Sequence, residues 1–135
     1  MNERDCRLCR IIAGEVPGQI VDEDERTLGL MAIEPATRGH VIVAPRRHAA
    51  DLFAVGDEDL AATVAAAKRV ATSVVDRLGA DGVNLINSCG RSAGQTVFHF
   101  HIHVIPRYAG DPLRLVWRSA ASGPDDISAV AAALR

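Results

Sequence analysis

Three histidines that alternate with bulky apolar residues constrain this chain more than any other feature. His99, His101 and His103 lie two residues apart within the segment Val97–Arg107. In an extended strand successive side chains point to opposite faces, so these three imidazoles would share one face. The apolar residues between them would share the other face and form part of the core. We therefore expect a strand over Val97–Arg107 whose imidazole face is a site, because buried imidazoles need partners for their nitrogens. A row of solvated surface histidines is the alternative.

The length and composition indicate one globular domain. The chain has 135 residues, of which 48% are apolar and 24% are charged, a balance typical of a single folded domain over residues 1–135. The formal net charge is −2 and no long basic run occurs, so nucleic acid is not an expected partner. No apolar run approaches the ~18–20 residues of a transmembrane helix, so no membrane association is expected.

The N-terminus and the cysteines indicate a cytoplasmic protein. Residues 1–5 are mostly charged and lead into no hydrophobic signal region, so a cytoplasmic location is the expectation. Three cysteines in an intracellular chain are unsuited to a disulfide framework. Metal ligation or simple burial explains them better.

Hydrophobic periodicity predicts five strands, which we place at residues 19–24, 27–33, 39–45, 82–87 and 97–107. The short turns between the first three favour an antiparallel meander. A long helix begins at Asp57 as its N-cap and ends before Gly79. Its apolar stripe consists of Leu60, Val64, Ala67, Ala71, Val74 and Leu78.

Short helices are predicted near both ends of the chain. Leu8, Ile11 and Ile12 have helical spacing, and Gly14 would end that helix. Near the other end, Asp125 or Asp126 can cap a short helix. One side of that last helix would carry Ile127, Val130, Ala131 and Leu134.

A C-x-x-C pair, Cys6 and Cys9, opens the folded part of the chain. Such a pair can be half of a zinc site, a redox motif, or two buried thiols. The redox interpretation needs a strand before the pair and a long helix after it, and neither is predicted here. Zinc ligation and plain burial remain as the two alternatives.

Two interpretations of the histidine row follow from metal geometry. In the first, the histidines bind one ion together, but the first and third lie ~13 Å apart along a strand and cannot share it. In the second, Cys6 and Cys9 form a closed Cys₂His₂ site with one strand histidine and one other, for which His48 is available. The remaining imidazoles then face a pocket beside the loop Ser88–Gln95, whose small polar residues suit a phosphate.

The second interpretation also allows a reaction at phosphorus. A neutral imidazole can attack phosphorus directly, and its ordinary pKa near ~6.5 keeps that form available at neutral pH. A neighbouring histidine can stabilise phosphate charge or protonate a leaving group. This interpretation uses both the cysteines and the histidines.

These motifs resemble those of the histidine triad (HIT) superfamily. The segment His99–Ile105 matches its H-x-H-x-H-x-x signature, in which x is hydrophobic. The match extends from about Cys6 to Arg107, and its closest branch resembles the bacterial histidine triad nucleotide-binding proteins. Further matching segments occur in family order: Cys6-x-x-Cys9 with Ile11-Ile12, Gly14–Pro17, Pro35, Gly39–Pro45 with His48, Asn87, and Ala93–Val97.

The resemblance implies an α+β, HIT-like fold with a five-stranded antiparallel sheet, one long helix and short terminal helices. The single HIT domain would have a motif-bearing core at about residues 6–107 and a C-terminal segment at 108–135. It also implies a homodimer whose sheets join edge to edge.

The implied activity is that of a nucleotide-binding hydrolase. It would act at the α-phosphorus of nucleoside phosphoramidates or related nucleotide conjugates, through a covalent nucleotidyl-histidine intermediate. The expected ligand is a purine nucleotide or a nucleotide conjugate. The alternatives are a dinucleoside polyphosphate hydrolase or phosphorylase, and a regulatory module that binds nucleotides without turnover.

The resemblance also assigns roles to residues. His101 would be the nucleophile, His103 would hold the phosphate, and His40 would belong to the polar network behind them. The phosphate would contact Asn87, Gln95 and Thr96. A structural zinc ion would be held by Cys6, Cys9, His48 and His99. The walls around the base would be Leu8, Ile11, Met31 and Ile33, which without the resemblance are plain core residues.

One position departs from the family pattern. Members usually carry an aspartate three residues before the proline that closes the second strand, where it holds the ribose hydroxyls. Here that position is Ala32, and Glu34 is the nearest acid after it. Discrimination of ribose from deoxyribose is therefore expected to be weak, whereas the chemistry at phosphorus is not affected.

Overall fold

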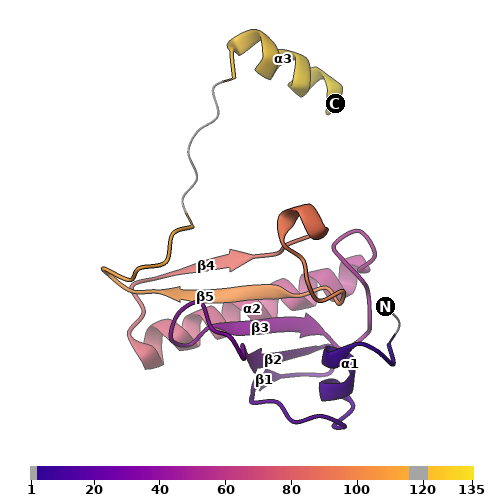
Figure 1. Ribbon diagram of the computed structural model, residues 1–135, viewed down its shortest axis with the longest axis vertical. Coiled ribbons are helices and arrows are strands. Elements are labelled where there is room, and N and C mark those ends of the chain that lie inside the picture. Colours follow the sequence, from indigo (N-terminus) through magenta and orange to yellow (C-terminus); the bar gives the residue numbers. More distant parts are fainter. Residues whose placement is uncertain (1–2, 116–121) are drawn as a thin grey trace.

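A five-stranded antiparallel sheet is the frame of the structure, a computed structural model that describes residues 3–115 and 122–135 (Figure 1). Its strands stand in the order β1-β2-β3-β5-β4. The predicted antiparallel meander of the first three strands is confirmed. The elements in chain order are α1 (Arg7–Ile12), β1 (Ile20–Glu23), β2 (Thr27–Met31), β3 (Val41–Pro45), α2 (Asp57–Leu78), β4 (Gly82–Ile86), the 3₁₀ helix η1 (Arg91–Ala93), β5 (Ile102–Arg107) and α3 (Pro124–Ala133).

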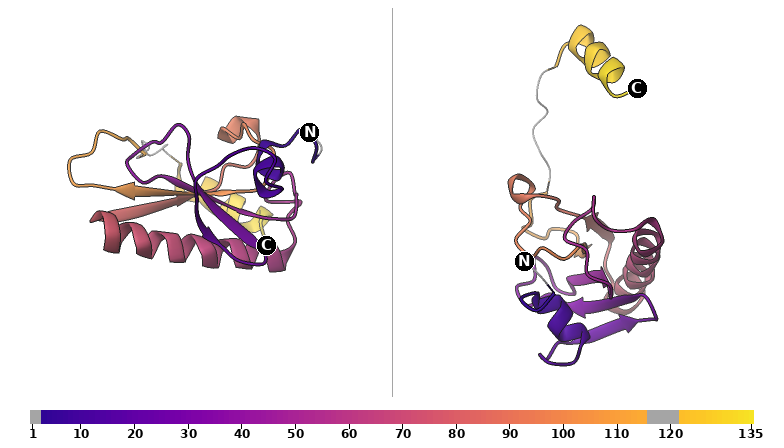
Figure 2. Two further views of the ribbon diagram at one scale, coloured as in Figure 1. Left: turned by 90° about the horizontal axis from the view of Figure 1, so that it is seen from below. Right: turned by 90° about the vertical axis from the view of Figure 1, so that its right-hand side faces the viewer.

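The long helix α2 covers one face of this sheet, and α1 and η1 lie on the other side (Figure 2). The two sides have separate apolar clusters. Under α2, residues of β3 and β5 such as Val43 and Val104 pack against Ala67, Val70 and Val74. Under α1, the cluster contains Cys6, Leu8, Ile11, Leu28, Leu30 and Ala44. The sheet thus separates a purely structural face from the face that carries the site.

Helix α2 has the predicted length but a different start and a shifted stripe. Its N-cap is Gly56, so the predicted cap Asp57 is wrong and is instead the first helical residue. Gly79 ends the helix at φ 71°, a left-handed conformation that favours glycine. Val64 is 47% exposed, because the buried face is centred on Thr63, Ala67, Val70 and Val74.

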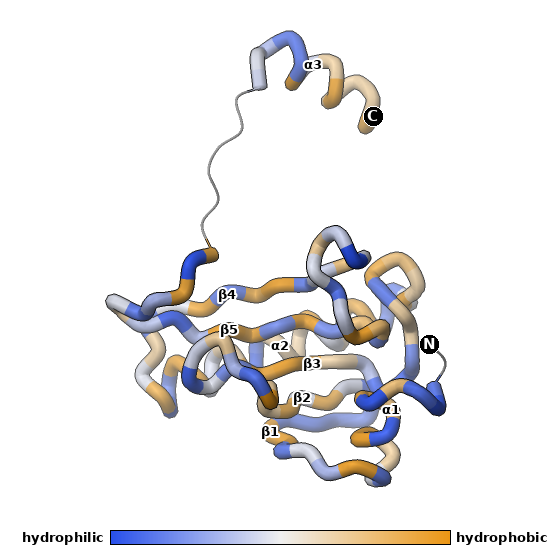
Figure 3. Tube along the Cα trace, viewed as in Figure 1, coloured by the Kyte–Doolittle hydropathy of each residue, from blue (hydrophilic) through white to orange (hydrophobic). Residues whose placement is uncertain are grey.

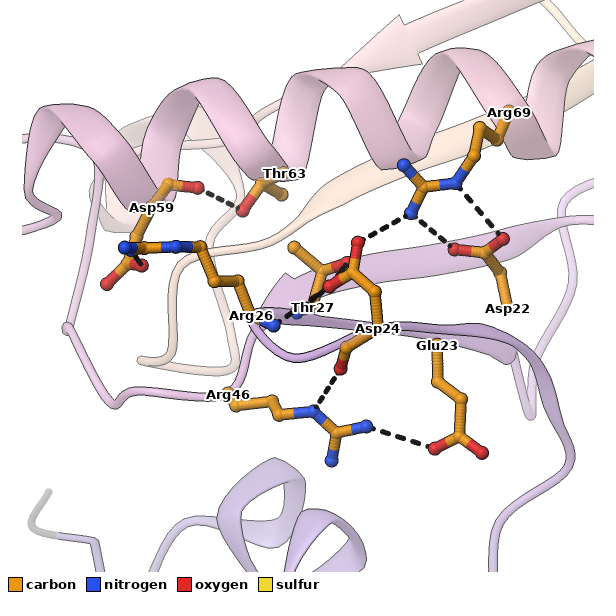
Figure 4. Close-up of polar contacts among 9 residues, drawn as sticks. All are labelled: Asp22, Glu23, Asp24, Arg26, Thr27, Arg46, Asp59, Thr63 and Arg69. Atoms are coloured by element: carbon orange, nitrogen blue, oxygen red, sulfur yellow. Dashed lines mark hydrogen bonds and ion pairs between the residues drawn. The ribbon is translucent and has the colours of Figure 1, made fainter.

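Arginine-to-carboxylate contacts attach the β1–β2 turn to α2 (Figure 4). Arg69 of α2 donates to Asp22 at 2.9 Å and to Asp24 at 3.0 Å. Arg26 beside that turn donates to the buried Asp59 of α2 at 2.9 Å. Exposed pairs of this kind contribute little individually. Together they fix the position of β2, whose end leads into the site.

Strand β5 begins at Ile102, so the strand predicted over Val97–Arg107 is five residues too long at its start. The residues before it are held by single contacts and not by a ladder. The backbone N–H of Phe100 donates to the carbonyl of Ala49 at 2.7 Å, and the side-chain amide of Asn87 donates to the carbonyl of His101 at 2.9 Å. His99 and His101 therefore lie outside the strand, and their side chains do not follow the alternation of a regular ladder.

The last helix, α3, begins after Gly123 as its N-cap. The predicted caps Asp125 and Asp126 are wrong in that role, and both lie in the first turn, where their charge complements the helix dipole. The helix stands apart from the sheet (Figure 1). Within the described ranges, no helix combines the length and apolar character that a membrane crossing requires.

Candidate functional site

The five histidines form two groups on the same side of the sheet. His48 and His99 meet the two N-terminal cysteines. His40, His101 and His103 line a cavity of about 420 Å³. His99 and His101 are two residues apart in sequence, yet their rings belong to different groups. The three triad histidines therefore do not act as one row.

The first group is a cluster of two thiols and two imidazoles. Its four candidate ligand atoms lie within 4.8 Å of one another. The Sγ atom of Cys9 lies 3.3 Å from Nδ1 of His48 and 3.4 Å from Nδ1 of His99. Sγ of Cys6 lies 3.4 Å from Nδ1 of His99, and the two Nδ1 atoms are 3.3 Å apart.

These distances fit a tetrahedral metal site. With bonds of ~2.0–2.3 Å to nitrogen and sulfur, a tetrahedral zinc ion separates its ligand atoms by ~3.3–3.8 Å. The donor set Cys₂His₂ is also one that zinc prefers. Cys6, Cys9, His48 and His99 thus form a site able to bind a metal ion, and the sequence placed all four in it.

The groups around the cluster also favour metal binding. Nε2 of His99 donates to the carbonyl of Pro45 at 2.8 Å, which leaves the lone pair of Nδ1 directed at the cysteines. Cys6 is the N-cap of α1 and accepts from the backbone N–H of Cys9 at 3.4 Å. Burial and the neighbouring Cys6 raise the pKa of Cys9 to about 12. A bound cation would offset both causes and allow the thiolate form.

The second group lines the cavity together with residues of four segments. Its lining combines polar residues of the loop after β4 with apolar residues of α1, β2 and β3. The volume lies within the range of small-molecule sites. The cavity is lined by Arg7, Leu8 and Ile11 of α1, by Leu30–Glu34, by His40 and Ile42, by Ser88 and Gly94–Val97, and by His101 and His103.

Hydrogen-bond partners assign the ring nitrogens of His40 and His103. The backbone N–H of Ala36 donates to Nδ1 of His40 at 3.0 Å, so the proton of His40 is on Nε2. That nitrogen lies 2.9 Å from Nδ1 of His103 and donates to it. The proton of His103 is therefore on Nε2, and within residues 3–115 and 122–135 this N–H has no acceptor.

The same reasoning applies to His101. Its Nδ1 lies 2.7 Å from the carbonyl of His99 and must donate to it. Its Nε2 consequently carries a lone pair, and its ring stands edge-on to that of His103 with centroids 4.9 Å apart. The cavity thus contains one imidazole lone pair beside one imidazole donor.

The pKa values favour neutral rings. Burial lowers the pKa of His101 below its usual range. Burial, followed by the nearby His101, lowers the pKa of His40. Burial, followed by His101 and His40, lowers the pKa of His103 to about 4. All three imidazoles are therefore neutral at pH 7, and His101 is in the form that can act as a nucleophile.

Of the three polar residues predicted at the phosphate, two line the cavity and the third does not. Thr96 is exposed and lines the cavity. Gln95 also lines it, but its side-chain amide is buried and bonded to the carbonyls of Ala50 and Val97 and to the N–H of Gly90. Asn87 lies outside the cavity lining in the described structure, and its amide holds the carbonyl of His101. Gln95 and Asn87 thus fix the loop and the segment that carries His101.

The four residues predicted around the base, Leu8, Ile11, Met31 and Ile33, all line the cavity. Ser88 belongs to the loop expected beside the pocket, whereas sequence reasoning missed Arg7 and Val97 and gave no role to Leu30 and Ile42. Alternation along β2 and β3 could have indicated the last two, since they pair across the strands. No sequence signal pointed to Arg7, whose position depends on how α1 is attached.

Comparisons with known proteins agree with this geometry. The family model for the HIT domain matches residues 13–110. A protein of solved structure from Streptococcus mutans, SMU.412c, is 34% identical, with 99% of this chain and 84% of that chain covered and a TM-score of 0.92. A zinc-bound histidine triad family protein from Mycobacterium smegmatis is 37% identical, with 98% and 95% covered and a TM-score of 0.79. A histidine triad nucleotide-binding protein from Candida albicans is 29% identical, with 96% and 94% covered and a TM-score of 0.85.

Proposed function

Because the chain belongs to the HIT family, we propose that it is a nucleotide-binding hydrolase acting at the α-phosphorus. Its substrates would be nucleoside phosphoramidates or related nucleotide conjugates. The observation that carries the proposal is the pairing of the free Nε2 lone pair of His101 with the free Nε2–H of His103 in one cavity.

In this proposal His101 is the nucleophile. Its Nε2 attacks the α-phosphorus, the P–N bond of the phosphoramidate breaks, and the amine leaves after taking up a proton. Water then breaks the histidine–phosphorus bond, which releases the nucleoside monophosphate and restores His101. The Nε2–H of His103 donates to a phosphoryl oxygen and stabilises the charge that develops there.

His40 and Asn87 position these two groups. His40 fixes the tautomer of His103 through the contact between their ring nitrogens. Asn87 fixes the backbone of His101. The exposed Thr96 and the backbone of Gln95 would contact the phosphate at the rim of the cavity. A catalytic imidazole held in one tautomer loses no free energy to rearrangement during the reaction.

The purine base would contact the apolar lining residues Leu8, Ile11, Met31 and Ile33. Apolar side chains of this kind contact the faces of any base and do not select one strongly. Ala32 lines the cavity, and its side chain offers no acceptor for the ribose hydroxyls. The protein would therefore accept ribonucleotides and deoxyribonucleotides alike.

Zinc is the metal that we assign to the Cys6, Cys9, His48 and His99 cluster, in a structural role. Four protein ligands leave no open position for water or substrate. The relative from M. smegmatis is zinc-bound, which supports the assignment. We also propose that the chain is one HIT domain, forms a homodimer and acts in the cytoplasm.

Turnover of two substrates by one sample tests the function. Hydrolysis of an adenosine phosphoramidate much faster than of a diadenosine polyphosphate supports the proposal. The reverse preference would indicate a dinucleoside polyphosphate hydrolase or phosphorylase. Nucleotide binding without turnover of either compound would indicate a regulatory module.

A further inference from the structure

The cavity contains an arginine that the proposed function leaves unused. Arg7, the first residue of α1, is exposed and lines the cavity together with Leu8 and Ile11. Figure 3 shows that α1 carries strongly hydrophilic as well as hydrophobic residues. The guanidinium group of an arginine is a cation that offers only hydrogen-bond donors. A ligand in the cavity therefore meets a cationic donor group as well as apolar side chains.

The side chain of Arg7 has no hydrogen-bond or ion-pair partner among the residues that the structure describes. Glu34 lines the same cavity, but the two side chains form no ion pair. By contrast, Arg10 in the same helix lies 3.7 Å from Glu15, and Arg69 holds a carboxylate at 2.9 Å. The donors of Arg7 are therefore available to a ligand, whereas those of Arg10 and Arg69 face acids of the chain.

The place of Arg7 on α1 indicates which part of a nucleotide it would meet. Arg7 and Ile11 are four residues apart in one helix, so their side chains lie on the same side of it. Leu8 follows Arg7 directly, and both Leu8 and Ile11 line the cavity. Leu8 and Ile11 are residues that would contact the purine base. The base is therefore the expected partner of the Arg7 guanidinium.

The hydrogen-bonding groups of the two common purines differ in what they offer to an arginine. Guanine presents two adjacent acceptors, O6 and N7, and a guanidinium can donate to both at once. Adenine presents the acceptor N7 next to its N6 amino group, which is a donor, so a guanidinium at that edge finds only one acceptor. A good bidentate contact favours the correct base by roughly 5- to 150-fold. Apolar side chains, which contact the ring faces, add little to this selection.

We propose that Arg7 determines base specificity and that the protein prefers guanine nucleotides over adenine nucleotides. The guanidinium of Arg7 donates to O6 and N7 of guanine, while the apolar lining residues contact the faces of the ring. The inference rests on the proposed function and deepens it, because it names the base of the substrate. Arg7 contacts the base and not the reacting phosphorus, so its loss should weaken binding and leave kcat nearly unchanged.

Calorimetric titration of the full chain with guanosine monophosphate and with adenosine monophosphate tests the proposal without turnover. We expect the wild-type protein to bind the guanine nucleotide about tenfold more tightly or better. Arg7→Leu should reduce the ratio of the two Kd values to within about twofold, since the donors are lost. The matched control Arg10→Leu removes the same charge from α1 at a residue outside the cavity lining and should keep the wild-type ratio.

A modified ligand separates the bidentate contact from simple charge. The 7-deaza analogue of guanosine monophosphate lacks the N7 acceptor, so the wild-type protein should bind it more weakly than the parent nucleotide, and Arg7→Leu should bind the two equally. Equal Kd values of the wild type for the guanine and adenine nucleotides would overturn the proposal while leaving the nucleotide site intact, and so would a guanine preference that survives in Arg7→Leu. Binding of neither nucleotide would instead refute the nucleotide site, and with it the proposed hydrolase.

Discussion

The two histidine groups differ in what occupies their ring nitrogens. In the cysteine cluster, Nε2 of His99 is bonded to the carbonyl of Pro45 and Nδ1 faces two sulfur atoms, so both ring nitrogens of His99 have partners inside the protein. In the cavity, the Nε2 atoms of His101 and His103 have no hydrogen-bond partner among the described residues and are available to a ligand. One residue type thus serves structure or chemistry according to which ring nitrogen the fold leaves available.

The largest expected effect comes from His101→Ala. We expect turnover of an adenosine phosphoramidate to fall by roughly 10³-fold or more, because the nucleophile is lost. Nucleotide binding should persist, since the rest of the cavity is unchanged, and the melting temperature should change little. Activity within about tenfold of wild type would show that another group attacks the phosphorus.

Cys9→Ser should mainly lower stability, whereas His101→Ala should mainly lower turnover. The Cys6, Cys9, His48 and His99 cluster would lose its ion. The melting temperature should fall by roughly 10 °C or more, because the ion links the N-terminal segment to the segments that follow β3 and precede β5. Elemental analysis should find about one zinc per wild-type chain and little in the variant. Metal-free wild-type protein of equal stability would show that the cysteines are simply buried thiols.

Acid should destabilise the cavity group through His103. Its pKa is lowered by burial to about 4 in the folded protein, against ~6.5 when unfolded. Between these values the unfolded chain binds more protons, so the free energy of unfolding decreases as the pH falls from about 6.5 to about 4, by on the order of 2 kcal/mol. Denaturant titrations at several pH values measure this. His103→Gln should flatten the dependence, and an unchanged slope would assign it to other groups.

The smallest expected effect is on the preference for ribose over deoxyribose substrates. Ala32→Asp adds a carboxylate acceptor at the cavity, and we expect the preference for ribose over deoxyribose substrates to rise by about tenfold. The ratio of kcat/KM for the two sugars measures the change. A wild-type preference already near a hundredfold would mean that another group, such as Glu34, holds the ribose.

The spacing of apolar residues and the positions of glycines were enough to predict most of the fold. The C-terminal end of α2 and the order of the strands along the chain follow from apolar spacing and from Gly79, because these signals are confined to neighbouring residues. The caps were less predictable. Gly56 and Gly123 act as N-caps, although an adjacent or nearby aspartate is usually the better cap.

The site required contacts between distant segments. The sequence identified the histidines, the cysteines and the four apolar wall residues by resemblance. The sequence did not show that the side-chain amides of Gln95 and Asn87 are hydrogen-bonded to backbone carbonyls. Those carbonyls belong to Ala50 and His101, which are distant in sequence from the two amides. Strand β5 was predicted too long for a related reason, since Ala49 takes the place of a ladder partner for Phe100.

Trapping the covalent intermediate tests the central claim most directly. The protein is mixed with an adenosine phosphoramidate, quenched within milliseconds and digested, and the peptides are analysed by mass spectrometry. The division between the two histidine groups predicts a nucleotidyl group on His101 and none on His99 or His48. A nucleotidyl group on another histidine, or turnover without any protein-bound nucleotide, would contradict it.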